Sequence, residues 1–222
     1  MPRDGPDALS ADDILPAYTL GYFPMARTAS DRDIVWVLPH ERGVLELIRA
    51  RAPRKLLRRL RRSTLHIRFD TAFVEVMKAC AAPAPGREDT WINDQILEAY
   101  SELHFRGHAH SVECWRDDRL VGGLYGVALG GVFCGESMFS READASKIAM
   151  LHLIARLRAG GFSLLDAQFH TDHLAQFGVE RMPRDAYLAR LQSLLTADAD
   201  FNAAEGYSSD NVSVWQSITQ TS

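Results

Sequence analysis

Several features are missing from this 222-residue sequence, and their absence narrows its class. No uninterrupted apolar run approaches the roughly 20 residues that a membrane-spanning helix needs. The polar, acidic start MPRDGPDALSADD lacks the basic and apolar regions of a secretory signal peptide. We therefore expect a globular, cytoplasmic protein that does not act at a membrane.

Cysteine is rare, with Cys80, Cys114 and Cys134 widely spaced and no CxxC pair. An odd number of cysteines in apolar or strand-like contexts is typical of buried thiols in a reducing compartment rather than of a disulfide framework. The histidine pairs in HAHS (108–111) and HTDH (170–173) have no third-ligand motif, and no GxSxG hydrolase motif accompanies them. Strand capping and solvent exposure are the simpler interpretation, so we expect neither a metal nor another cofactor.

The composition is that of a folded chain, with 46% hydrophobic residues and a formal net charge of −4. A chain of this size buries one good core and at most a small second one, so we expect one or two domains. Because no large apolar repeat indicates obligate assembly, a monomer is the default expectation.

The negative net charge argues against a general nucleic-acid binder, yet residues 49–62, RARAPRKLLRRLRR, carry eight basic residues and no acidic one. After Pro53 the leucines recur at helical spacing, which predicts a short amphipathic helix with leucines inward and cations outward. Such a run is either a solvated helix face or a site for a phosphate backbone. The candidate contacts are Arg54, Lys55, Arg58, Arg59, Arg61 and Arg62.

Hydrophobic periodicity along the chain predicts an α+β fold. A helix at 11–17 and two aromatic-rich strand segments make a small N-terminal domain, residues 1–62, which ends with the basic helix. Residues 63–195 then predict strand, helix, helix, two strands, helix, strand and helix, an order that describes a domain with a mixed sheet. Residues 196–222 are a polar tail with one tryptophan.

The segment 108–140 predicts two strands, HSVECW and GGLYGVALGGVFCGESMF, joined by a turn at Asp117-Asp118. Six glycines in the second strand are more than an ordinary strand tolerates, so some should mark bulges or close approach of a ligand. Glu136 is expected at the end of this strand, either as a solvated turn carboxylate or as part of a site. Asp166 and Gln168 lie two apart on the strand LLDAQF, which places both side chains on one face.

Nine motifs follow one another from Tyr18 to Leu194: GYFPM, WxxPxxRGVL, TWI, LHxxGHAHSVExW, LVGGLYGVALGGxFxGESMFS, ASKxA, LLDxQ, TxHLxxFG and PRxxYL. In this order they resemble the leucyl/phenylalanyl-tRNA–protein transferases of bacteria, and so many long motifs rarely match by chance. The resemblance implies a C-terminal domain like the GNAT acetyltransferase fold. It also implies transfer of leucine or phenylalanine, and less readily methionine, from aminoacyl-tRNA to the N-terminal amine of proteins beginning with arginine or lysine, which marks them for degradation.

The same resemblance implies roles for particular residues. Asp166 and Gln168 match a pair in which the aspartate orients the glutamine amide, whose oxygen accepts from the attacking amine. Glu136 matches a glutamate associated with the basic acceptor terminus. The predicted aminoacyl pocket contains Leu124, Phe133 and Met138, with leucine at 124 in place of the methionine associated with the family.

Tryptophans supply the remaining candidate substrate contacts. Trp36 and Trp91 either stack on the terminal adenosine or contact the aminoacyl group, with core packing as the alternative. The segment IVWVLP around Trp36 departs from the family pattern of two tryptophans and a serine before the proline. The six cations at 54–62 are expected to contact the tRNA.

The implied reaction needs little beyond alignment, because an aminoacyl ester is already activated. An α-amine has a pKa of about 8, so near pH 7.5 a general base would gain less than ~1 kcal/mol. Holding amine and ester in place contributes about 7–11 kcal/mol. Two other functions stay open: an acetyl-CoA-dependent acetyltransferase, although SREADASKIA stands where its Q/RxxGxG/A phosphate loop would be, and an RNA-binding module, which would leave the carboxylates unexplained.

Overall fold

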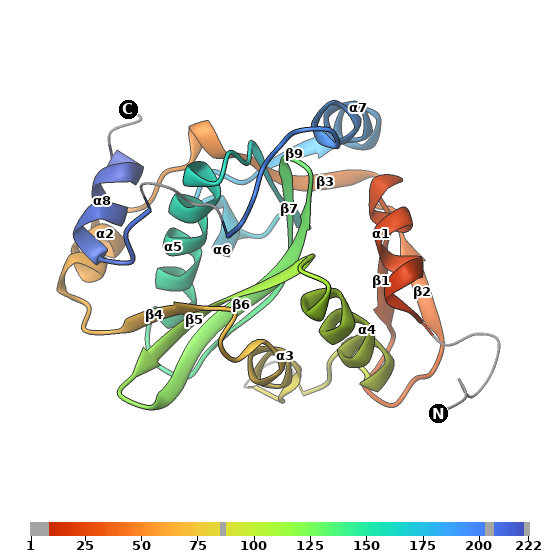
Figure 1. Ribbon diagram of the computed structural model, residues 1–222, viewed down its shortest axis with the longest axis horizontal. Helices are drawn as coiled ribbons and strands as arrows, with labels where there is room; N and C mark the ends of the chain where they lie inside the picture. The colour runs from red at the N-terminus through yellow and green to blue at the C-terminus, as the bar shows by residue number, and fades with distance from the viewer. Residues whose placement is uncertain (1–8, 85–87, 203–206, 220–222) are drawn as a thin grey trace.

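The computed structural model describes residues 9–84, 88–202 and 207–219, so parts of the predicted N-terminal domain and tail lie outside it. Within this part of the chain, seven strands form one sheet. In chain order they are β3 (Glu41–Glu46), β4 (His66–Phe69), β5 (Ala109–Arg116), β6 (Arg119–Leu129), β7 (Val132–Ser140), β8 (Leu164–Gln168) and β9 (Glu180–Pro183). Their order across the sheet is β4-β5-β6-β7-β8-β3-β9 (Figure 1). In this sheet β7 and β8 are parallel and the other neighbours are antiparallel, so the predicted α+β fold with a mixed sheet is confirmed.

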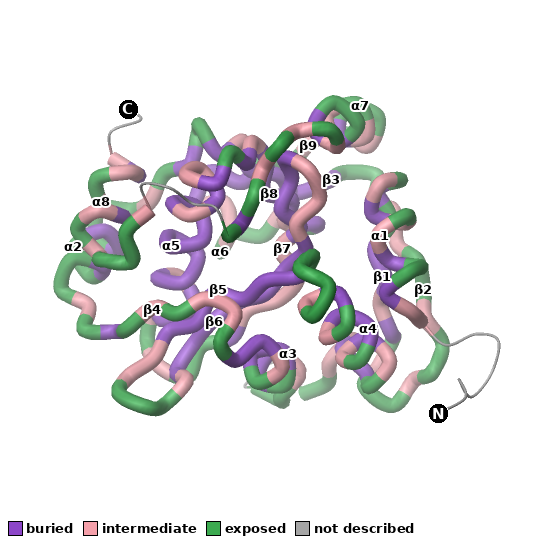
Figure 2. The backbone as a smooth tube through the Cα atoms, viewed as in Figure 1, coloured by how far each residue is buried: buried purple, intermediate pink, exposed green. Residues whose placement is uncertain are grey.

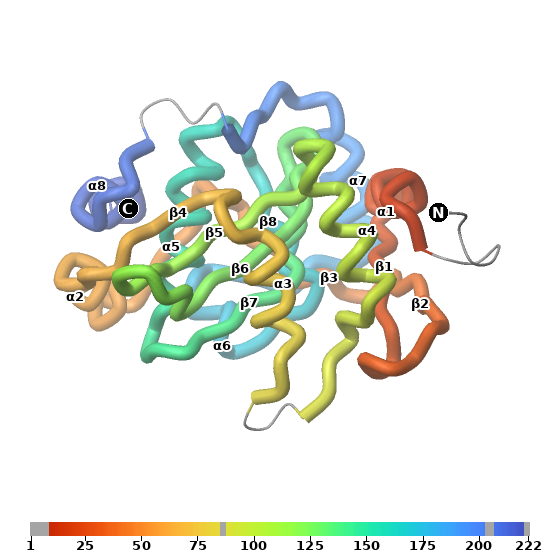
Figure 3. Tube along the Cα trace, turned by 60° about the horizontal axis from the view of Figure 1, so that its bottom comes forward, coloured from red at the N-terminus to blue at the C-terminus, as the bar shows by residue number. Residues whose placement is uncertain are grey.

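Helices cover both faces of the sheet. They are α1 (Ala11–Thr19), η1 (a 3-10 helix, Leu47–Arg49), α2 (Arg54–Arg62), α3 (Phe73–Ala81), α4 (Asp94–Phe105), α5 (Ala145–Ala159), α6 (Asp172–Ala175), α7 (Arg184–Leu194) and α8 (Asn211–Thr219). The helices α3 and α4 pack on one face and α5 on the other (Figures 1 and 3). Alternate residues of a strand therefore join different cores: Leu124 packs on the α5 side and Tyr125 on the α3 side. The central strands and α5 are buried, whereas α2 and α8 expose their outer faces (Figure 2).

The N-terminal part joins α1 to a two-stranded sheet of β1 (Phe23–Ala26) and β2 (Ile34–Val37). Ser10 precedes α1 as its N-cap, and it forms a capping box with Asp13. The next strand, β3, does not stay with this part: it pairs with β8 and β9 in the central sheet. The division at residue 62 stays a prediction, and β3, which precedes it, is part of the sheet that carries the site.

The glycine-rich segment corrects two predictions. It forms two strands, β6 and β7, rather than one, because Gly130 and Gly131 turn the chain between them. Gly130 has φ +52°, and a Cβ there would lie 2.4 Å from the carbonyl oxygen of Leu194. Glu136 is accordingly within β7 and not at its end.

The position of Glu136 is a bulge. Gly135 pairs with Gly126 and Ser137 with Tyr125, so Glu136 is the extra residue where the register shifts. A bulge bends a strand and redirects a side chain. This local irregularity places the carboxylate beside the neighbouring strand β8.

The C-terminal part is more ordered than a polar tail. Residues 211–219 form α8, which packs on α2 and α5, and its Val214 and Ile218 are buried. The short edge strand β9 was not predicted, because ERMP has no apolar alternation. None of the described helices is long and apolar enough to cross a membrane.

Candidate active site

A pocket opens where β7 and β8 separate. The two strands pair from Val132 with Leu164 to Cys134 with Asp166, and the pairing ends there. Just beyond lies a pocket of about 260 Å³. Its apolar lining comes from three strands and two helices, with Leu124, Met138, Met150, Leu153, Leu165, Ala167 and Leu174. Glu136 lies at its wall, together with a few polar groups from Ser137, Thr171 and His173.

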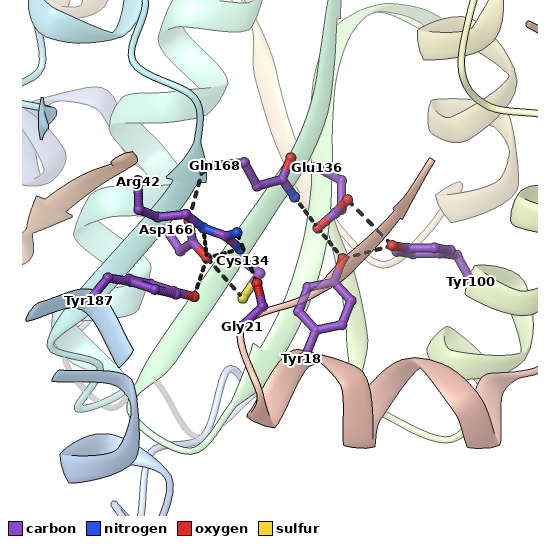
Figure 4. A network of polar contacts seen from close by, with 9 residues as sticks. All are labelled: Tyr18, Gly21, Arg42, Tyr100, Cys134, Glu136, Asp166, Gln168 and Tyr187. Atoms are coloured by element: carbon purple, nitrogen blue, oxygen red, sulfur yellow. Dashed lines mark hydrogen bonds and ion pairs between the residues drawn. The ribbon is translucent and has the colours of Figure 1, made fainter. Parts of the chain in front are cut away.

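Asp166 is fully buried and paired with the buried guanidinium of Arg42 (Figure 4). The Nε of Arg42 donates to Asp166 Oδ1 at 2.8 Å and its Nη2 to Oδ2 at 2.7 Å. Tyr187 donates to Oδ2 at 2.6 Å. Burial alone would lower the pKa of Arg42, but the adjacent Asp166 carboxylate outweighs it and raises that pKa. With its lone pairs occupied and a cation beside it, Asp166 organises the site rather than serving as a base.

Arg42 also contacts three residues other than Asp166. Its Nη1 donates to the carbonyl oxygen of Gly21 at 3.1 Å, and the rings of Phe23 and Tyr187 each lie 4.7 Å from the guanidinium carbon. Cation–π contacts of this kind strengthen when they are desolvated. The pair Arg42–Asp166 therefore joins β3, β8, α7 and the turn after α1 at one point.

Gln168 ends β8 in an unusual backbone conformation, with φ +60°. A left-handed residue other than glycine costs on the order of 1–2 kcal/mol, so the surroundings must hold it. Its N–H donates to Asp166 Oδ1 at 2.8 Å. Gly43 on β3 leaves room for the turn that follows Gln168, because a Cβ at position 43 would lie 2.6 Å from the carbonyl carbon of Phe169.

The amide of Gln168 points to Glu136 and not to Asp166. Its Nε2 donates to Glu136 Oε1 at 2.7 Å, which leaves the amide oxygen facing away from that carboxylate (Figure 4). The resemblance implied that the aspartate orients this amide. In the structure Asp166 fixes the backbone of Gln168, and Glu136 fixes its side chain.

Glu136 is surrounded by hydroxyl and amide donors. Tyr18 donates to Oε1 at 2.5 Å, Tyr100 lies 3.4 Å from Oε2, and the two tyrosine hydroxyls are 2.7 Å apart. Among the described residues no Lys or Arg forms an ion pair with Glu136. Burial raises the pKa of Glu136 to about 7, although hydrogen bonds from Tyr18 and Gln168 oppose the shift. The site thus holds one carboxylate with a cation and one without.

Of the other predicted substrate-binding residues, some line this pocket and some lie elsewhere. Leu124 and Met138 line the pocket beside Glu136. Phe133 does not: it is fully buried under α5, with its ring 5.7 Å from that of Phe201. Trp36 lines a separate hollow of about 910 Å³ between α1 and β2, and half-buried Trp91 packs against the core on the α3 side. Their roles in substrate binding stay predictions.

The predicted basic helix is confirmed as α2. Its leucines, Leu56, Leu57 and Leu60, are buried, and all six candidate cations are exposed. Arg59 pairs with Asp144, and Arg61 lies over the ring of Trp215 at 4.9 Å. The helix thus presents a positively charged outer face.

Several site residues were not assigned a role from sequence: Tyr18, Arg42, Tyr100, Cys134 and Tyr187. A signal existed for Arg42 and Tyr187, which belong to the motifs WxxPxxRGVL and PRxxYL. The Cys134 thiol lies 3.8 Å from Asp166 Oδ2, and burial raises its pKa well above the usual range, so it is not a ready nucleophile.

The chemistry of the site is that of positioning. No cluster of three His, Cys, Asp or Glu side chains in the described ranges is arranged to hold a metal ion. An apolar pocket lies beside a rigid amide and an unpaired carboxylate. Such a site can hold an apolar group in the pocket and a polar or cationic group beside Glu136, an arrangement that suits a transferase.

Comparison with known proteins identifies the class further. A family model described as leucyl/phenylalanyl-tRNA protein transferase matches residues 44–192. The leucyl/phenylalanyl-tRNA–protein transferase of Phenylobacterium zucineum (strain HLK1) is 55% identical, over 87% of each chain. Its counterpart from Caulobacter vibrioides (strain NA1000 / CB15N) is 52% identical over 88% of this chain and 90% of that one. The transferase of Maricaulis maris (strain MCS10) is 49% identical over 96% of this chain and 98% of that one.

The chain belongs to the leucyl/phenylalanyl-tRNA protein transferase family, which confirms the resemblance seen in its motifs. Among solved structures, a functionally unknown conserved protein from Staphylococcus epidermidis ATCC 12228 aligns with 64% of this chain and 57% of its own. Its identity of 12% and TM-score of 0.39 are too low to support an argument about fold.

Proposed function

We propose that this protein transfers leucine or phenylalanine, and less readily methionine, from aminoacyl-tRNA to the N-terminal α-amine of proteins that begin with arginine or lysine. Family membership makes it an aminoacyl-tRNA-dependent transferase. One observation carries the finer proposal: an apolar pocket lies beside Glu136, a carboxylate without a cationic partner in the described part of the chain. The products are proteins marked for degradation.

The pocket is the proposed seat of the aminoacyl side chain. Its lining by Leu124, Met138 and their neighbours suits a leucyl, phenylalanyl or methionyl group in a volume of about 260 Å³. A polar side chain would lose its hydrogen bonds to water there without replacement. A missing methylene changes binding by only about 1–3 kcal/mol, so some exchange among the three amino acids is expected.

Gln168 is the proposed partner of the attacking amine. Its amide oxygen, free of Glu136, accepts a hydrogen bond from the amine, while Asp166 and Gly43 hold the backbone that carries it. Alignment of this kind contributes about 7–11 kcal/mol. No proton-accepting role is needed from Asp166, which Arg42 already neutralises.

Glu136 is the proposed counter-charge for the arginine or lysine side chain of the acceptor. A hydrogen bond between charged groups is worth about 1.5–3 kcal/mol, more than a neutral one. The exposed cations of α2 are proposed to contact the tRNA, with Trp36 and Trp91 as further substrate contacts. Separation of the parallel strands β7 and β8 supports a GNAT-like catalytic domain, and we propose a cytoplasmic monomer.

The test is transfer of label from leucyl-tRNA to peptides that begin with Arg, Lys or Ala. We expect label on the first two peptides only. Gln168→Ala should lower kcat about 100-fold with little change in tRNA affinity, since a misplaced reacting group costs that much. Gln216→Ala, at an exposed position of α8, is the matched control.

Other outcomes identify the two rival functions. Consumption of acetyl-CoA without transfer from leucyl-tRNA would indicate an acetyltransferase. Binding of tRNA without any transfer would indicate an RNA-binding module. Equal labelling of the Ala peptide would contradict the role proposed for Glu136.

A further inference from the structure

The C-terminal strap, residues 196–202 and 207–219, lies outside the family match at 44–192 and folds over α5 onto α2 (Figure 1). Its first part is anchored where α5 ends: the Asp200 N–H donates to the carbonyl oxygen of Gly160 at 3.0 Å. Phe201 is buried, with its ring 4.2 Å from that of His110 on β5. The strap is therefore tied to the core of the catalytic sheet.

The helix α8 of the strap covers the apolar face of α2. Val214 and Ile218 are buried in the same core cluster as Leu56, Leu57 and Leu60. Among the described helices, α2 packs chiefly on α8 and less on α5. The position of the basic helix thus depends on the strap.

A chain of hydrogen bonds also connects α5, the strap and the end of α2. His152, buried on α5, accepts at Nδ1 from the Tyr207 hydroxyl at 2.8 Å and donates from Nε2 to Asn211 Oδ1 at 3.0 Å. Asn211 Nδ2 in turn donates to the carbonyl oxygen of Ser63, the residue that caps the end of α2, at 3.0 Å. Burial lowers the pKa of His152 to about 4, so the imidazole is neutral at physiological pH and satisfies both partners.

The strap is linked through α5 to the segment that precedes α2, and it contacts the last turn of α2 directly. Before the helix, Arg158 of α5 donates to the carbonyl oxygens of Leu47 in η1 and Ser217 in α8, at 2.8 and 2.7 Å. Near its end, the Trp215 ring lies 4.9 Å from the guanidinium carbon of Arg61. The strap packs on the leucine face of α2 and, through Trp215, also contacts the cation Arg61.

We propose that the C-terminal strap positions α2 for the body of the tRNA, so that tRNA affinity depends on Asn211, which is bonded to the end of α2, and on Trp215, which packs against Arg61. This inference rests on the proposed function, because it assumes that the cations of α2 bind tRNA. Binding to phosphates depends on where several cations lie at once, since each contributes to one summed electrostatic interaction. A helix that shifts loses part of that interaction without losing any charge.

The experiment measures tRNA binding by fluorescence anisotropy separately from leucyl transfer, using the full chain. Asn211→Ala and Trp215→Ala should each raise the Kd for leucyl-tRNA about fivefold to tenfold and reduce its salt dependence. Their kcat at saturating leucyl-tRNA should stay within about twofold of wild type, since the pocket and Gln168 are untouched. Gln216→Ala, exposed on the same helix, should leave both quantities unchanged.

A double-variant comparison tests whether α2 carries the effect. In a background of Arg58→Ala and Arg62→Ala, adding Asn211→Ala should raise the Kd by less than it does in wild type, because two of the six cations that the strap positions are already gone. An unchanged Kd in both strap variants, with only the thermal stability lowered, would overturn the inference. If Asn211→Ala does not fold, Trp215→Ala decides alone. Absence of transfer by wild type would instead reject the proposed function, and it leaves the Kd measurement intact.

Discussion

Asp166 and Glu136 are carboxylates on neighbouring strands, β8 and β7, yet among the described residues Asp166 forms an ion pair with Arg42 and Glu136 forms none. Asp166 receives two guanidinium nitrogens of Arg42, a tyrosine hydroxyl and a backbone N–H. Glu136 receives hydroxyls and an amide, and borders the pocket. Gln168 lies between the two groups and contacts both (Figure 4).

In the function that we propose, this difference assigns Asp166 to the structure of the site and Glu136 to substrate binding. The charge of Asp166 is neutralised during folding, so its interactions are complete before any substrate arrives. The charge of Glu136 is disfavoured by burial, which raises its pKa to about 7, and a cation from outside would relieve that penalty. Glu136, which forms no ion pair with the described residues, is thus the carboxylate that a basic acceptor would complete.

Removal of Arg42 should have the largest effect, and this effect should be a loss of stability. Arg42→Leu leaves Asp166 buried and uncompensated, which typically costs about 3–5 kcal/mol of unfolding free energy. Urea denaturation measures the loss. Arg181→Leu, which breaks an exposed pair with Glu41, is the control and should cost at most about 1 kcal/mol. Equal losses for the two variants would mean that the buried pair does not organise the site.

Arg42 also marks the limit of what the sequence could predict. Periodicity was sufficient for the helices before residue 195 that have an apolar face and for the strand carrying Asp166 and Gln168, because burial on one face is a local pattern. A buried arginine has no such pattern, since nothing near position 42 reveals an aspartate 124 positions later along the chain. Its motif membership was visible, but its partner required the pairing of β3 with β8.

Glu136→Gln should have the next largest effect, and it should act on acceptor recognition. We expect kcat/KM for an Arg peptide to fall about 10- to 100-fold, the loss of one charged hydrogen bond of about 1.5–3 kcal/mol. Unfolding free energy should stay the same or rise, because a buried charge is removed. Opposite behaviour, with stability lost and peptide selectivity kept, would place Glu136 with Asp166 as a structural carboxylate.

The same variant carries a pH prediction. A raised pKa of about 7 means that Glu136 is protonated below this pH and ionised above it, so wild-type kcat/KM for the Arg peptide should rise through pH 7. The acceptor amine loses its proton near pH 8 in both proteins, so the ratio of wild type to Glu136→Gln isolates the carboxylate. A ratio that stays flat from pH 6 to 8 would contradict the prediction.

The glycine-rich segment and the C-terminal part show a second limit of prediction from the sequence. Strand character was evident, but β6 and β7 were merged because their alternation continues through Gly130 and Gly131 without a polar break. The bulge that turns Glu136 toward β8 depends on register between strands, which no single strand encodes. For α8, the few apolar residues of the tail gave little amphipathic signal, and its helix is stabilised by packing on α2 and α5.

The smallest expected effect comes from removing one tyrosine hydroxyl beside each carboxylate in turn. Tyr18→Phe removes the hydrogen bond to Glu136 and should cost about 0.5–1.5 kcal/mol of unfolding free energy. Because that hydrogen bond holds the pKa of Glu136 down, its loss should move the pH–rate profile for the Arg peptide to higher pH. Tyr187→Phe removes the matching hydroxyl from Asp166, where Arg42 remains, so stability should fall by a similar amount with no movement of the profile. A shift in both variants would mean that the two carboxylates titrate as one coupled unit, and the division between folding and recognition would no longer hold.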